Sequence, residues 1–251
     1  MSALPRAALN KVPAVTLAFW AIKIIATTLG ETGGDALSMT LGVGYLASTA
    51  IFFGFFLITL TAQVSARRYV AALYWLVILS TTTAGTTLSD FLDRTAHLGY
   101  LGGSALLLGA LAVVLTAWRL TLGSITFDHV ADRRVEVFYW VTILVSNTLG
   151  TALGDFTADQ AGLGFGGGAL VFGGALALIA AAYLFTPISR TVLFWSAFVL
   201  TRPLGAVLGD SLTKPHAQGG LQLGTLPSSL TLAVAMVLLI VVGARRAAPR
   251  G

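Results

Sequence analysis

The sequence contains little charge and no cysteine. Only 10% of its 251 residues are charged, 56% are hydrophobic, and the mean hydropathy is +0.87. A soluble domain carries roughly 25% charged residues, so this composition excludes a water-soluble globular protein and indicates an integral membrane protein. Without cysteine there is no thiolate to bind soft metals, and nothing indicates the redox compartment.

Eight apolar stretches are long enough to cross a membrane as helices, which need roughly 17 to 25 residues for this. They are rich in leucine and alanine and lack the period-two alternation of strands, so we expect an all-α polytopic protein. The first stretch lacks a cleavage signature and is interpreted as a mature helix. The stretches lie near residues 13–34, 41–62, 69–90, 99–118, 135–155, 165–187, 190–209 and 225–243.

Basic residues outside these stretches gather on one side of them. Eleven lie at the termini and in alternate connections, whereas the opposite loops hold only Arg94 and Lys214. Cytoplasmic loops carry the excess of Lys and Arg, so we expect both termini in the cytoplasm. The net charge of +5 then reflects topology and does not indicate nucleic-acid binding. The eleven are Arg6, Lys11, Arg67, Arg68, Arg119, Arg133, Arg134, Arg190, Arg245, Arg246 and Arg250.

One unit is repeated four times along the chain. Its tryptophans are Trp20, Trp75, Trp140 and Trp195, at spacings of 55, 65 and 55 residues, so the chain consists of two duplicated halves. We expect four parallel two-helix repeats, each a hairpin, near 12–66, 67–120, 132–188 and 189–246, with a cytoplasmic connection at 121–131. Any site that the repeats share would lie near their common axis.

A stripe of small residues at spacing four follows the first helix of each repeat. Its central glycine comes ten residues after the tryptophan, as Gly30, Gly85, Gly150 and Gly205. Small residues at this spacing allow membrane helices to approach closely. We therefore expect the first helices of the four repeats to pack around a common centre through these glycines.

A polar stripe lies on the same helices, at offsets of three and four residues that share one helix face. It comprises Thr28, Glu31 and Asp35, then Thr83, Thr86 and Asp90, then Thr148, Thr151 and Asp155. In the fourth repeat the equivalent residues are Pro203, Ala206 and Asp210. Ionisable groups in a membrane helix are expensive and indicate function. The second helices contain no charged residue within 41–66, 98–117, 161–189 and 217–244, so we expect them to face lipid or to pack.

The aspartates lie fifteen residues after the tryptophans, or about 22 Å along the helix. If the tryptophans form the cytoplasmic aromatic belt, the carboxylates line a cavity that opens to the outside. Carboxylate, hydroxyl and carbonyl oxygens suit Mn²⁺, Mg²⁺ or Ca²⁺ better than Cu⁺ or Zn²⁺. We therefore expect Glu31 and the four aspartates to bind a divalent cation or protons, with the five stripe threonines as hydroxyl ligands.

Several of these residues also have a structural interpretation. An aspartate at a helix end can cap the following turn, and gene duplication would copy that device. Arg202 either forms a salt bridge to Glu31 or an aspartate, or is a countercharge that leaves when a cation binds. Lys23 can snorkel towards the cytoplasmic interface. Solvated loop positions are expected for Asp93, Arg94, Asp159, Lys214, His97, His129 and His216.

A glycine also follows each tryptophan by 24 residues, in the turn between the two helices of a repeat: Gly44, Gly99, Gly164 and Gly219. Close backbone packing or a bend before the second helix explains these glycines. The glycine run at 162–168 is not a phosphate loop, because it follows no strand and no Lys-Ser/Thr pair comes next. Because no nucleophile with its base and no cofactor fingerprint is present, we expect neither an enzyme nor a bound cofactor.

The repeated motif resembles a bacterial family of small polytopic membrane proteins built from tandem copies of a repeat of unknown function. Its copies are residues 27–35, 82–90, 147–155 and 202–210, and the similarity covers nearly the whole chain. This resemblance implies the bacterial inner membrane and no particular activity. A weaker similarity relates residues 31–35 to the Glu-x-Gly-Asp signature of calcium and manganese cation/proton exchangers. Here the motif has one residue too many, lacks the following basic residue and occurs once instead of twice.

Two functional hypotheses follow. The first is a transporter of a divalent cation, with manganese export in exchange for protons as its leading form. The second is a membrane binding or sensory protein whose acidic cluster binds ions or a ligand without moving them. In both, the partners are membrane lipid, an inorganic cation and protons, and flux into proteoliposomes separates them.

Overall fold

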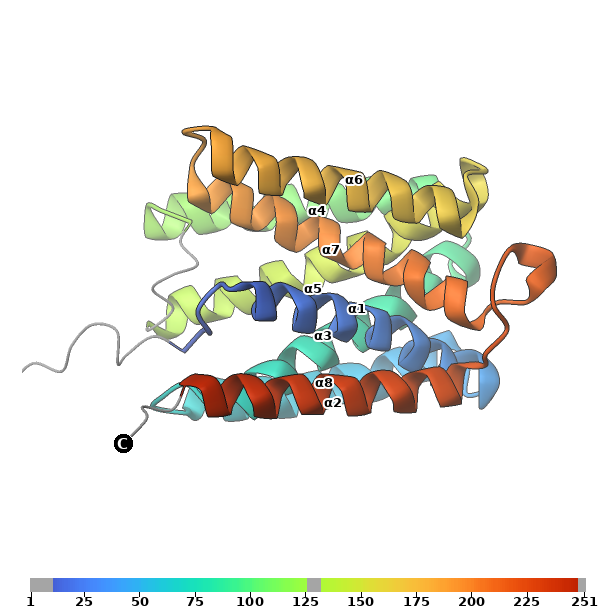
Figure 1. Cartoon of the computed structure of the whole chain (residues 1–251), viewed down its shortest axis with the longest axis horizontal. Coiled ribbons are helices and arrows are strands. Elements are labelled where there is room, and N and C mark those ends of the chain that lie inside the picture. Colours follow the sequence, from blue (N-terminus) through green and yellow to red (C-terminus); the bar gives the residue numbers. More distant parts are fainter. Residues whose placement is uncertain (1–10, 126–131, 248–251) are drawn as a thin grey trace, which may run out of the picture.

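The computed structural model describes residues 11–125 and 132–247, with side chains up to residue 243, and within these ranges it consists of helices without strands (Figure 1). Arg6, His129, Arg250 and most of the 121–131 connection lie outside the described residues, as do the side chains of Arg245 and Arg246. The α-helices are α1 (Leu17–Asp35), α2 (Tyr45–Ser65), α3 (Ala71–Asp90), α4 (Gly99–Leu122), α5 (Arg133–Asp155), α6 (Gly164–Phe185), α7 (Arg190–Thr213) and α8 (Thr225–Ala247).

Seven of these helices are long and apolar enough to cross a membrane, counted over the described residues. The exception is α1, whose hydropathy is lowered by Lys23, Glu31 and Asp35. Its polar side chains are buried within the bundle and so are not exposed to lipid. The predicted all-α class, with helices long and apolar enough to cross a membrane, is confirmed.

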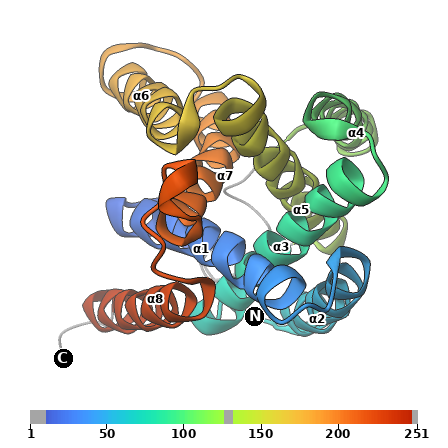
Figure 2. The same cartoon turned by 90° about the vertical axis from the view of Figure 1, so that its right-hand side faces the viewer.

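The odd-numbered helices form a closed inner ring, in which α1 contacts α3, α3 contacts α5, α5 contacts α7 and α7 contacts α1 (Figure 2). The even-numbered helices lie outside this ring (Figure 2). In the most apolar stretch of α3, α5 and α7, 67% of residues are buried, against 11 to 17% in the even-numbered helices. The outer helices therefore shield the charged side chains of the inner helices from lipid. This agrees with the expectation that the charge-free second helices face lipid or pack.

Each outer helix packs mainly against the first helix of the next repeat and not against its own: α2 on α3, α4 on α5, α6 on α7, and α8 back on α1. This differs from the predicted hairpins. The connection turns at Gly44, Gly99, Gly164 and Gly219, whose φ values are 83°, 66°, 63° and 86°. A Cβ at these positions would meet nothing within 4 Å. Glycine is therefore required here by the positive φ angle of the backbone. Close packing is not the reason, because there is room for a side chain.

The stripe glycines lie at the contacts between inner helices. A Cβ on Gly30 would collide with Thr82, on Gly85 with Asn147, on Gly150 with Arg202, and on Gly205 with Thr27. Each glycine, ten residues after its tryptophan, thus faces the residue seven after the tryptophan in the next repeat, and the fourth repeat closes onto the first. The lack of a side chain lets the helix axes come close.

Aromatic side chains fill the ring at the end where the inner helices begin. Trp75 and Trp140 are only 3% and 1% exposed, and the hydroxyl oxygens of Tyr74 and Tyr139 are 2.8 Å apart. The rings of Tyr74 and Trp140 have centroids 5.4 Å apart. Trp75 and Trp140 therefore belong to the core, whereas the sequence interpretation places an interfacial belt there. We refer to this end as the aromatic end and to the opposite one as the aspartate end.

Candidate functional site

A buried polar cluster connects all four inner helices towards the aspartate end. Arg202 on α7 is fully buried, and its Nη2 donates to Glu31 Oε2 at 2.9 Å and to the hydroxyls of Thr86 and Thr151 at 2.6 Å each. Glu31, Thr86 and Thr151 occupy the same position of the first three repeats. The fourth repeat has Ala206 there, and the guanidinium of Arg202, one turn earlier, fills the missing place.

The glycine stripe makes room for this guanidinium. A Cβ on Gly150 would overlap Cβ and Cγ of Arg202, so glycine allows the stem of Arg202 to pass between α5 and α7. Both interpretations of Arg202, as a salt-bridge residue and as a displaceable countercharge, require an acidic partner. In the structure that partner is Glu31. Asp210 instead pairs with Lys214, which lies outside the polar stripe.

The four repeat aspartates form two pairs, each held by one basic side chain. Lys214 Nζ lies 2.7 Å from Asp35 Oδ2 and 3.2 Å from Asp210 Oδ1. Arg94 bridges the other pair, with Nε 3.0 Å from Asp90 Oδ1 and Nη2 3.5 Å from Asp155 Oδ2. The expected single site on the axis is thus divided in two.

The prediction that Arg94 and Lys214 are solvated loop charges is wrong, because their side chains are only 33% and 16% exposed and both are ion-paired. Burial lowers the pKa of the Lys214 ammonium, but the carboxylates of Asp210 and Asp35 outweigh burial and hold that pKa above its usual value. The sequence does contain a signal. Both residues follow a repeat aspartate by four positions, which is one helical turn.

The helices do not end at the first three aspartates. One π-helical turn follows each, namely η2 (Ala36–Thr40), η3 (Phe91–Thr95) and η4 (Phe156–Gln160). The side chains of Asp35, Asp90 and Asp155 make no capping hydrogen bond to these turns, so the capping interpretation finds no support. Single π-helical turns are frequent at functional sites.

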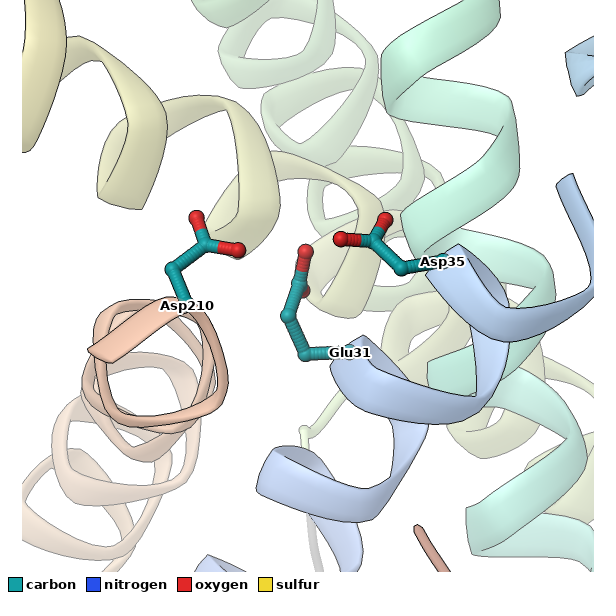
Figure 3. Close-up of side chains that lie close together, drawn as sticks. All are labelled: Glu31, Asp35 and Asp210. Carbon is teal, nitrogen blue, oxygen red and sulfur yellow. The ribbon is translucent and has the colours of Figure 1, made fainter. Parts of the chain in front are cut away.

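Three carboxylates come together beside Lys214. Oxygen atoms of Glu31, Asp35 and Asp210 all lie within 4.8 Å of one another, and all three side chains are buried. Figure 3 shows the groups from α1 and α7 turned towards one another. Oxygens on opposite sides of a Ca²⁺ ion are about 5 Å apart and those around Mg²⁺ about 4 Å at most. The donor set therefore fits a hard divalent cation, and a spacing of up to 4.8 Å lies at the Ca²⁺ end of this range.

The charges around this cluster do not balance. Five buried carboxylates, those of Glu31 and the four aspartates, face the three cations of Arg94, Arg202 and Lys214. Two negative charges remain when all groups are ionised. One divalent cation or two protons would neutralise them.

A second polar layer lies nearer the aromatic end. Lys23 is fully buried, with Nζ 3.3 Å from Asn147 Oδ1 and 4.1 Å from the centre of the Phe198 ring. Asn147 in turn donates to the hydroxyl of Thr81 at 2.9 Å. Lys23 does not snorkel as expected, because α3, α7 and α8 pack around α1.

The remaining expected residues lie apart from the carboxylates. The hydroxyls of Thr28, Thr83 and Thr148 each donate to a backbone carbonyl four residues earlier in the same helix. Asp159 accepts from the Tyr100 hydroxyl at 3.2 Å. The prediction of a solvated position for Asp93 is wrong, because its side chain is buried and accepts from Ser89 at 3.3 Å. Thr86 and Thr151 are thus the stripe threonines that reach the cluster: both accept from Arg202, and Thr86 also donates to Glu31 Oε2 at 3.3 Å.

Comparison with known proteins identifies the repeat. The family model described as Repeat of Unknown Function (DUF347) matches the chain four times in tandem, at residues 18–69, 73–123, 138–189 and 193–248. These matches cover most of the chain and confirm the resemblance to a tandem-repeat membrane family. No curated protein and no solved structure matches it.

Proposed function

The chain belongs to the Repeat of Unknown Function (DUF347) family, and we propose that it transports a divalent cation across the membrane through the carboxylates of Glu31, Asp35 and Asp210. The observation that carries this proposal is the meeting of these three buried carboxylates, with oxygens within 4.8 Å of one another, inside a ring of membrane helices. Burying such a group is costly unless a cation compensates it.

Access to this site is from the aspartate end. Arg94 and Lys214, which cover the carboxylates there, keep 33% and 16% of their side chains exposed. At the aromatic end Tyr74, Tyr139 and Trp140 are at most 1% exposed and close the ring. The excess of basic residues in the loops of the aromatic end supports an orientation with the aspartate end outside and both termini in the cytoplasm. Transport then requires the aromatic end to open in a second state.

Protons are the coupling ions in this proposal, and manganese leaving the cytoplasm is its leading form. With Lys214 in place, Glu31, Asp35 and Asp210 face two cations, Lys214 and Arg202, and one proton neutralises the remaining charge. Replacing that proton by a metal couples the two fluxes. Oxygen ligands without thiolate or imidazole suit Mn²⁺, Mg²⁺ and Ca²⁺.

Flux measurements on the purified protein in proteoliposomes test the proposal. An imposed pH gradient should drive Mn²⁺ across the membrane, with K⁺ as the control ion that is not moved. Mn²⁺ binding without flux would assign the chain to the sensory class instead. Absence of both binding and flux for Mn²⁺, Mg²⁺ and Ca²⁺ would refute a cation site.

A further inference from the structure

Arg94 and Lys214 are equivalent residues of repeats 2 and 4. Each lies nineteen residues after its tryptophan and four after its aspartate, and each bridges that aspartate to the aspartate of the following repeat. The other two repeats have Met39 and Asp159 at this position. The chain therefore has two related aspartate pairs, each of which joins the two halves and is bridged by one basic side chain.

The two basic groups meet their carboxylates in different ways. The guanidinium of Arg94 uses separate nitrogens for its two carboxylates and lies 5.9 Å from the ring centres of both Tyr45 and Tyr100. Lys214 meets Asp35 and Asp210 through Nζ alone, with Met39 Sδ 4.0 Å away. An arginine meets two carboxylates with a planar fork of nitrogens, whereas a lysine is a point charge on a flexible stem.

Lys214 leaves its carboxylates incompletely satisfied. Asp210 Oδ1 is buried and accepts no hydrogen bond from the described residues, although the ammonium lies 3.2 Å away. The backbone of Lys214 is held at both sides, because its N–H donates to Asp210 O at 2.9 Å and its carbonyl accepts from Gln222 N at 3.0 Å. Any movement of the ammonium must therefore come from rotation of the four-carbon stem, whose side chain is already 16% exposed.

We propose that Lys214 is a tethered cation, which occupies the group of Glu31, Asp35 and Asp210 when no metal is bound and leaves when a divalent cation enters. This inference rests on the proposed function. Without Lys214, the three carboxylates and the buried Arg202 carry two net negative charges, which one divalent cation neutralises. Arg94, which bridges Asp90 and Asp155 in the same way, stays in place in this proposal, so the chain has one exchangeable site and one fixed counterpart.

Titration of the purified full chain with Mn²⁺, followed by loss of the free-ion paramagnetic resonance signal, tests this inference. Lys214→Gln removes the competing charge and should tighten Mn²⁺ binding by about tenfold or more. Lys214→Arg keeps the charge and should not tighten it. Arg119→Gln, which removes an exposed charge on α4, should leave the affinity of the wild type unchanged.

The outcomes separate the two proposals. If the wild type binds Mn²⁺ and Lys214→Gln binds it equally or less tightly, the tethered-cation inference is wrong while the cation site stands. An equal gain in Arg94→Gln would also overturn it, because the aspartate pairs would then be interchangeable. If Lys214→Gln does not fold, Lys214→Arg decides the question, since a gain in affinity with the charge retained contradicts displacement. A wild type that binds no divalent cation ends both proposals.

Discussion

Arg202 and Glu31 form a buried ion pair that joins the fourth repeat to the first, across 171 positions of sequence, with Nη2 2.9 Å from Oε2. The same contact lies between α7 and α1, where the ring of inner helices closes. Neither charge occurs at the equivalent position of another repeat. The pair therefore closes the ring through two residues, one in the first repeat and one in the fourth, that have no charged equivalent in the other repeats.

Loss of one member of this pair should destabilise the protein more than loss of both. Glu31→Gln leaves the Arg202 guanidinium buried without its carboxylate, which costs about 3 to 5 kcal/mol in comparable pairs. Adding Arg202→Met removes the uncompensated charge and should restore much of the lost stability. Thermal unfolding in detergent measures both variants, and additive losses in the double variant would show that the two side chains are not coupled.

The contact of Gly205 with Thr27 should tolerate no added methyl group. A Cβ there would lie 2.8 Å from the backbone carbonyl carbon of Thr27, so Gly205→Ala should cost about 1 to 3 kcal/mol by separating α7 from α1. Gly109→Ala on α4 is the control, because its Cβ would meet nothing within 4 Å. Equal unfolding temperatures of the two variants would contradict the packing role of the stripe.

A double-mutant cycle measures how strongly the hydroxyls of Tyr74 and Tyr139 are coupled at the aromatic end. Tyr74→Phe or Tyr139→Phe alone leaves one buried hydroxyl without its partner at 2.8 Å, at a cost of about 1 kcal/mol. The double replacement removes both hydroxyls and should cost little more than either single change. The free energies of unfolding of the three variants give the coupling energy. If the double variant loses as much stability as the two single variants together, the hydroxyl groups are not coupled by a stabilising hydrogen bond.

Because the chain contains no cysteine, single introduced thiols report membrane topology without background. Ser124→Cys and Ala217→Cys place thiols at exposed positions in the connections after α4 and α7. In intact cells a membrane-impermeant maleimide should label Ala217→Cys and leave Ser124→Cys unlabelled until the membrane is opened. The reverse pattern would place the aspartate end in the cytoplasm and invert the proposed direction of access.

The repeats and the inner position of the glycine stripes follow from the sequence because both depend on local, periodic spacing. The ion pairs of Arg94 and Lys214 do not, because a helix ending at the aspartate puts the residue four positions later in a loop. The π-helical turn η3 keeps Arg94 on the helix, and α7 extends to Thr213. Closure of α7 on α1 is needed before Arg202 can reach Glu31, and no local pattern encodes that contact.

Cation flux in proteoliposomes with Asp35→Asn tests the central claim most directly. The change keeps the size of the side chain and removes one charge from the group with Glu31 and Asp210, so pH-driven Mn²⁺ flux should fall by about tenfold or more, the equivalent of about 1.4 kcal/mol. Asp159→Asn, at an exposed position of the same end, should retain the flux of the wild type. If correctly folded Asp35→Asn protein transports Mn²⁺ as fast as the wild type, these carboxylates serve only as ion-pair partners of Lys214 and Arg202, and the cation site does not exist.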